Sequence, residues 1–286
     1  MFERISRSWE LVKASYAVLR ADKELIVFPI ISMLGTLAVM IVFAIPMALA
    51  GSFGRMADGD TGIFEYVIAF MFYLVMYTVV IFSNVALVGA AMIRLRGGDP
   101  SASDGFKIAM DHLPQILGYA AISATVGLLL RALRERGGLA AMVAAWFGEM
   151  AWNLATFLVV PVLVIENVGP VEAIKRSGSL LKRTWGEQVV GNFSIGLIFG
   201  LLTVAAVIVV GLPLGALAAA SGSVVMIVLA VGIIVLLVVG ISLVGSALNG
   251  IYVAALYRYA TENVVSDQYF SSELVQGAFQ EKRKRF

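Results

Sequence analysis

Four polar residues fall inside otherwise apolar stretches of this 286-residue chain. Asn84, Asn153 and Asn249 each lie in the second half of an apolar run, and Glu149 precedes Asn153 by one helical turn. Amides at one depth can line a path for a solute or bond neighbouring helices together, and an intramembrane carboxylate can carry a proton. We expect the asparagines to be structural and Glu149 to lie at the outer boundary of the membrane, where water solvates it.

No catalytic or metal-binding pattern accompanies these residues. The chain has no cysteine and one histidine, which excludes disulfides, thiolate chemistry and the zinc sites built from cysteine and histidine. The sequence also lacks the GxSxG, HExxH and phosphate-binding GxxxxGK[ST] patterns. We therefore expect no enzyme activity and no cofactor.

The composition is that of an integral membrane protein. Hydrophobic residues make up 60% of the chain and charged residues 14%, and the mean hydropathy is +0.93. A soluble domain carries about a quarter charged residues, because water must solvate its surface. Lipid must therefore cover much of this chain. With a net charge of only +2, we expect no nucleic-acid partner.

Six apolar runs are long enough to cross the hydrocarbon, which takes about 20 helical residues. They lie near 25–50, 63–93, 115–133, 138–165, 188–219 and 223–257. Only helices satisfy their own backbone groups in lipid, so the fold class is an all-α polytopic bundle. We expect one transmembrane domain over 1–258, kinks at Pro46, Pro161 and Pro213, and a basic tail over 259–286.

Basic residues indicate the orientation of the bundle. With six spans, 17 of the 21 lysines and arginines fall in the two termini and the even-numbered connections, and four fall in the other loops. Basic residues stay on the cytoplasmic side during insertion. Both termini are therefore predicted to lie in the cytoplasm, and with no cleavable signal peptide visible the first span should start insertion.

The cytoplasmic segments contain amphipathic helices. The first has an apolar stripe at helical spacing, made of Phe2, Ile5, Trp9, Val12, Tyr16 and Leu19. The third repeats the pattern with Val171, Ile174, Gly178, Leu181 and Trp185, and the second has a weaker version in Phe106, Met110, Leu113 and Leu117. A surface helix followed by two spans thus occurs three times, which predicts a threefold internal repeat.

Aromatic and basic residues of these segments are expected to anchor the protein at the inner membrane face. Trp9, Tyr16 and Trp185 suit the headgroup boundary. The tail residues Lys282, Arg283, Lys284 and Arg285 suit anionic headgroups, each charge contributing about 1 kcal/mol near the surface. Asp22, just before the first span, is a predicted helix N-cap.

Two stretches carry a family resemblance. The opening FERISRSWELVKASYAVLRADKELIVFP and the later VVPVLVIENVGPVEAIKRSGSLLKRTWGEQ resemble an uncharacterised family of prokaryotic membrane proteins, known only as a domain of unknown function. The later stretch is also loosely similar to the membrane part of some bacterial glycerophosphodiester phosphodiesterases. The first resemblance implies a prokaryotic plasma membrane, and neither implies an active site.

Two functions remain open at this point. The first is a non-enzymatic membrane protein whose cytoplasmic-face helices engage lipid headgroups or a partner protein, since the informative residues gather at one membrane face. The alternative is a small-solute permease or channel in which the three asparagines and Glu149 line a path. Transporter spans usually have more polar or broken segments at mid-depth than these spans show.

Overall fold

The structure is a computed structural model that describes residues 2–51, 54, 62–136, 138–185, 194–262 and 269–270. For residues 2–8, 136, 184–185, 194 and 197 it describes the backbone alone. The predicted basic tail from residue 271 onward therefore lies outside the described residues, as does the side chain of Trp185.

Within the described ranges the chain is all α-helical, and six of its helical segments are long and apolar enough to cross a membrane. These segments are Lys23–Leu49, Ile63–Leu95, Leu113–Glu135, Leu139–Glu166, Ile198–Ala220 and Val224–Glu262. They match the six predicted runs to within a few residues wherever the chain is described. The all-α fold class and the six spans are confirmed.

Some spans are built from several helices. The first joins a 3₁₀ turn, η1 (Lys23–Ile26), to α2 (Val27–Leu49). The second is α4 (Ile63–Leu95), the third α6 (Leu113–Arg136) and the last α12 (Val224–Glu262). The fourth comprises α7 (Leu139–Thr156) and α8 (Val159–Glu166), and the fifth comprises α10 (Ser194–Ala206), a π-helical turn η3 (Val207–Gly211) and α11 (Leu212–Ala220).

Two of the three predicted proline kinks coincide with interruptions of helical geometry. Pro161 has no N–H to give to the carbonyl four residues earlier, and the fourth span is broken at Phe157 and Leu158. Pro213 lies two residues after the end of the π-helical turn of the fifth span, and that turn accommodates its ring. Pro46 lies within α2, which is assigned as one continuous helix.

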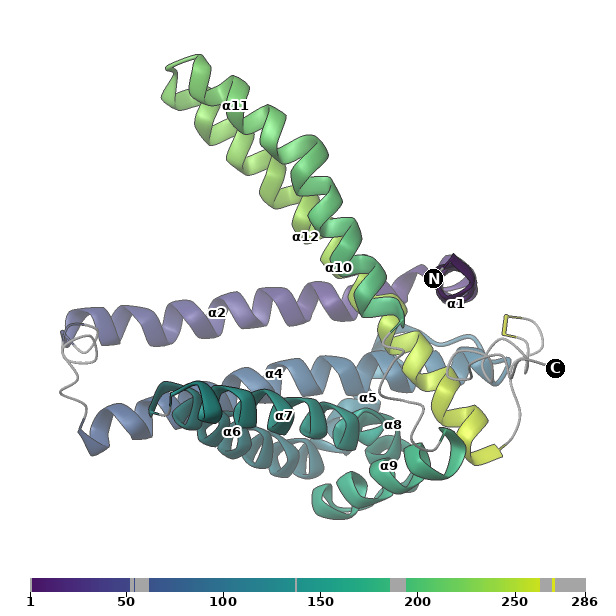
Figure 1. The fold of residues 1–286 in the computed structure, drawn as a ribbon. Helices are drawn as coiled ribbons and strands as arrows, with labels where there is room; N and C mark the ends of the chain where they lie inside the picture. The colour runs from purple at the N-terminus through teal and green to yellow at the C-terminus, as the bar shows by residue number, and fades with distance from the viewer. Residues whose placement is uncertain are drawn as a thin grey trace.

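Three short helices precede the three pairs of spans. They are α1 (Phe2–Ala21), α5 (Ala102–Asp111) and α9 (Pro170–Trp185). The element order is therefore short helix, span and returning span, three times over, as the sequence pattern predicts. All three lie toward the end of the bundle where α4, α8 and α12 terminate (Figure 1).

The spans form two groups. In Figure 1, α2, α4, α6 and α7 run side by side, and consecutive spans of this group are in contact. The hairpin of α10, α11 and the amino-terminal half of α12 diverges from them. The side chains of that hairpin are mostly exposed and apolar, as expected for a surface that faces lipid.

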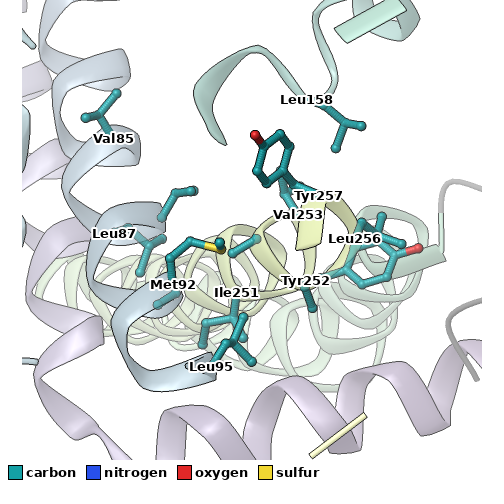
Figure 2. Packing of buried hydrophobic residues seen from close by; sticks show 14 of the residues in the cluster. Val85, Leu87, Met92, Leu95, Leu158, Ile251, Tyr252, Val253, Leu256 and Tyr257 are labelled. Carbon is teal, nitrogen blue, oxygen red and sulfur yellow. The ribbon is translucent and has the colours of Figure 1, made fainter. Parts of the chain in front are cut away.

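The buried core lies where the carboxyl-terminal halves of α4 and α12 cross. Figure 2 shows Leu87, Met92 and Leu95 of α4 close to Ile251 of α12, and all four are buried. The cluster also contains side chains from α1, α2, α5, α6, α8, α9 and α10. The core therefore joins the short helices to the ends of the spans.

Gly105 permits one close helix contact in this region. A Cβ atom added at Gly105 of α5 would lie 2.7 Å from the carbonyl oxygen of Ala86 in α4 and 2.8 Å from a ring carbon of Phe28. Both distances are shorter than side chains tolerate. The glycine thus lets α5 lie directly on the backbone of α4.

Candidate functional site

Helix α1 divides its predicted apolar stripe between protein and surroundings. Val12 and Leu19 of the predicted stripe are buried in the bundle, and so are Leu11, Ser15 and Val18, which the prediction left off the stripe. Trp9 and Tyr16, on the other flank, are 49% and 53% exposed. The helix contacts α10 and α12 on one side, so the apolar stripe lies at the edge of the protein and only part of it meets other helices. Its two aromatic side chains are therefore exposed on the outer flank of the bundle.

Helix α9 shows the same division. Its inner face is formed by Ala173, Ser177 and Leu180, each fully or almost fully buried against the fourth span. Val171, which the sequence pattern put on the apolar stripe, is exposed instead. The true inner face is rotated from the predicted stripe because small side chains allow the closest approach to α7 and α8.

Ser177 connects α9 to the interruption of the fourth span. The backbone N–H of Leu158, which the break removes from the helical ladder, donates a hydrogen bond of 2.9 Å to the hydroxyl oxygen of Ser177. Both residues are fully buried. A buried N–H without a partner is costly, so this bond fixes α9 to the broken segment.

Helix α5 is held by its cap and by aromatic packing. The Ser101 hydroxyl accepts from the N–H of Asp104, and the Asp104 carboxylate accepts from the N–H and hydroxyl of Ser101. Those last two bonds stabilise the ionised form and lower the pKa of Asp104. Phe106 packs on Phe28 of α2 and Phe82 of α4, with ring centroids 5.2 and 6.3 Å apart.

Asp22 pairs with an arginine of the second span. Its carboxylate accepts from Nε of Arg94 at 3.3 Å, while another N–H of Arg94 bonds Asp99. The predicted N-cap role is wrong, since the Asp22 side chain accepts no capping hydrogen bond. Burial raises the pKa of Asp22 above its usual range, although Arg94 acts in the opposite direction.

Further ion pairs bind the ends of the spans to one another. Glu262 of α12 accepts from Arg96, which directly follows α4, at 2.7 Å and from Arg258 at 3.1 Å. Glu166 of α8 accepts from the hydroxyl of Tyr257 at 3.1 Å and from Arg176 of α9 at 3.0 Å. These contacts join α4, α8, α9 and α12 at one end of the bundle.

The charge left over at this end is positive. Six exposed basic side chains make no hydrogen bond or ion pair with any described residue: Lys13, Arg20, Lys23, Lys107, Lys175 and Lys182. Three exposed acidic side chains are in the same situation, namely Glu10, Asp111 and Glu172. Hydrogen bonds to neutral groups leave a charge in place, so all 11 basic and nine acidic side chains described at this end count, and the excess is two basic groups.

The four polar residues of the apolar runs are dispersed. Glu149 forms an ion pair with Arg134, and together with Asn153 it lines a cavity of about 570 Å³ between α4, α6 and α7. Asn84 is half-buried in α4, Asn249 is exposed on α12, and neither lines that cavity. No hydrogen bond joins the three asparagines among the described residues.

A model of the family of unknown function DUF6159 matches residues 63–266, more than half of the chain. The chain belongs to this family. The match includes the stretch 159–188 that carries the resemblance, whereas the opening 2–29 lies before it. No curated protein and no solved structure matches the chain. The looser likeness to the membrane part of phosphodiesterases thus has no support.

The cavity in this DUF6159 chain brings together residues that the sequence did not associate. Tyr73 and Tyr77 come from α4, whereas Arg131 comes from α6, and all three line it. Their spacing within each helix carried a signal, since Tyr73 and Tyr77 are four residues apart and share a helix face. Nothing in the sequence indicated that this face meets the arginines of α6.

Proposed function

We propose that this DUF6159 protein is a non-enzymatic protein of the prokaryotic plasma membrane, with both termini in the cytoplasm. In this proposal helices α1, α5 and α9 lie at the cytoplasmic face and engage anionic lipid headgroups. The proposal adds an orientation and a ligand to what is established, namely a multi-span membrane protein of the DUF6159 family.

The observation that carries this proposal is the set of six unpaired basic side chains. Arginines such as Arg94 and Arg258 are occupied by ion pairs and carbonyl groups, so they hold the bundle together. Lys175 and Lys182 are exposed on α9 and have no such partner. Near an anionic membrane surface each such charge contributes about 1 kcal/mol, which makes an excess of two a measurable preference.

The alternative function, a small-solute permease or channel, has less support from the structure. A path for a polar solute needs several polar groups at one depth, because one amide cannot replace a hydration shell. Asn84, Asn153 and Asn249 come from helices of both span groups, and only Asn153 lines the cavity. Their dispersal favours separate structural roles.

Lipid selectivity tests the proposal. The purified protein is placed in bilayers of equal phosphatidylglycerol and phosphatidylcholine, extracted gently, and its retained lipids are quantified by mass spectrometry. We expect phosphatidylglycerol to be enriched, and we expect Lys175→Gln with Lys182→Gln to reduce the enrichment. Glu172→Gln, a matched change on the same helix, removes an unpaired acid and should increase it. Equal retention in all three proteins would refute a headgroup role for α9.

Orientation is tested separately with reporters that work only in the cytoplasm. They should be active when fused after residue 20, 100, 175 or 286 and inactive after residue 58 or 221. Activity at 221 would place the fifth and sixth spans differently and would move α9 away from the cytoplasmic lipids.

A further inference from the structure

The cavity between α4, α6 and α7 lies far from the basic end of the bundle. Tyr77 precedes the end of α4 by about 18 residues, which is roughly 27 Å of helix at 1.5 Å per residue. Glu149 precedes the end of α8 by about 17 residues, or roughly 25 Å. The hydrocarbon layer is about 30 Å thick, so the cavity opens at the opposite headgroup boundary.

The charges that line the cavity balance one another. Arg131 donates to Glu135 at 2.7 Å and to the hydroxyl of Tyr73 at 3.0 Å. Arg134 pairs with Glu149 across from α6 to α7. Two guanidinium groups and two carboxylates therefore share one cavity with no net charge, and this balance disfavours a ligand that is purely anionic or purely cationic.

Several polar groups in the cavity have unused bonding capacity. Among the described residues, Glu149 accepts through one oxygen and Arg134 donates to it through one of its five N–H groups. The hydroxyl of Tyr77, the amide of Asn153 and the indole N–H of Trp152 make no side-chain hydrogen bond with described residues. Both donors and acceptors are thus available to a ligand at the same place.

Aromatic rings form part of the same wall. The rings of Tyr73 and Tyr77 are stacked with centroids 6.3 Å apart, and Trp152 lines the cavity from α7. Aromatic faces attract ammonium groups through cation–π contacts, especially beside a carboxylate such as Glu149. Cavities of 300–1,000 Å³ are typical of small-molecule sites, and about 570 Å³ falls in that range.

We propose that this cavity binds a zwitterion that carries an ammonium group and a phosphate or carboxylate, such as a phosphoethanolamine headgroup. The ammonium lies against Glu149 and the aromatic rings. The anionic group lies against Arg131 and Arg134, whose planar donors suit phosphate and carboxylate oxygens. The position at the membrane boundary allows the ligand to come from a phospholipid in the bilayer or from a free solute.

Fluorescence titration tests this site directly. Replacing Trp9, Trp146 and Trp185 with phenylalanine leaves Trp152, in the cavity wall, as the reporter among the four tryptophans. This protein in detergent is titrated with short-chain phosphatidylethanolamine and with short-chain phosphatidylglycerol, which has the phosphate but no ammonium. We expect the first to bind about tenfold more tightly, because a charge-assisted hydrogen bond distinguishes them. Equal affinities would overturn the proposal.

A single substitution tests which side chain binds the ammonium group of the ligand. Glu149→Gln should lower the affinity for phosphatidylethanolamine that Trp152 reports to that for phosphatidylglycerol, whereas Glu172→Gln, which lies outside the cavity, should leave both transitions of the Trp152 signal unchanged even where it alters lipid retention on α9. If Glu149→Gln does not fold, Tyr77→Phe removes a single hydroxyl and should weaken binding by several-fold. Selectivity that persists in the folded variant would assign the signal to another surface.

The source of the ligand is decided by competition. Free phosphoethanolamine is added to the protein saturated with short-chain phosphatidylethanolamine. Displacement means that the polar group alone is recognised and assigns the site to a solute. Absence of displacement means that the acyl chains contribute and assigns it to a lipid. Both results follow from a zwitterion site, whereas displacement by free inorganic phosphate at the same concentration would contradict the ammonium contact.

Discussion

Replacing Ser177 with alanine tests whether helix α9 is fixed to the broken fourth span. The change removes the hydroxyl that accepts the Leu158 N–H at 2.9 Å and leaves the rest of the inner face intact. Both residues are fully buried, so water cannot take the place of the hydroxyl. Pro161 prevents the local backbone from returning to an uninterrupted helix, and the N–H therefore stays without a partner.

The expected cost follows from the burial of that N–H. An unsatisfied buried donor costs about 1–3 kcal/mol, and hydrogen bonds between helices in membranes are worth about 0.6–1.7 kcal/mol. We expect a loss of about 1–2 kcal/mol. For a chain of this size each kcal/mol lowers the midpoint of thermal unfolding by about 2–4 °C, so the midpoint should fall by roughly 2–8 °C.

Ser179 provides the matched control on the same helix. It is exposed, and its hydroxyl donates to the carbonyl oxygen of Arg176 within α9. Ser179→Ala therefore makes the same chemical change and gains the same helix propensity without exposing a buried donor. Thermal unfolding of both variants is measured in one detergent. Midpoints that agree to within about 1 °C would refute the role assigned to Ser177.

Three further substitutions have defined outcomes. Gly105→Ala should lower the unfolding midpoint, because overpacking against the Ala86 carbonyl costs about 1–3 kcal/mol, whereas Gly178→Ala meets open space and should be neutral or stabilising when both are followed by thermal unfolding. Asp22→Asn should gain stability relative to the wild type as pH rises from about 4 toward neutrality in the same assay, since a raised carboxyl pKa means that the folded state holds its proton longer than the unfolded state. Asn249→Leu should leave ion leak in proteoliposomes unchanged, because the side chain is exposed on α12 and does not line the cavity.

The spans were predictable from the sequence because their signal is local. An apolar run of sufficient length must form a helix in lipid, whatever its neighbours are. The breaks at Pro161 and Pro213 follow in the same way from the missing N–H of proline. Family membership also depended on the residue pattern alone.

The faces of the short helices were predicted only in part. The period of the apolar stripe in α1 and α9 was correct, but the pattern could not separate the flank that meets protein from the flank that meets lipid. Both environments are apolar, so hydrophobicity does not distinguish them. Small residues such as Ser15 and Ser177 mark the inner face, because they let helices approach closely.

What the sequence by itself determined is therefore an all-α membrane protein with six spans, three short surface helices and a strongly asymmetric distribution of basic residues. Only the tertiary structure decided which of those basic residues form ion pairs within the protein. It also decided that Glu149 and Asn153 share a cavity with Tyr77 and Arg131. The physical reason is the distance along the chain over which each feature is decided. Span formation depends on consecutive residues of one helix. A binding site depends on how helices that are distant in the chain rotate and cross, and contacts such as the one between Leu87 and Gly250 determine that arrangement.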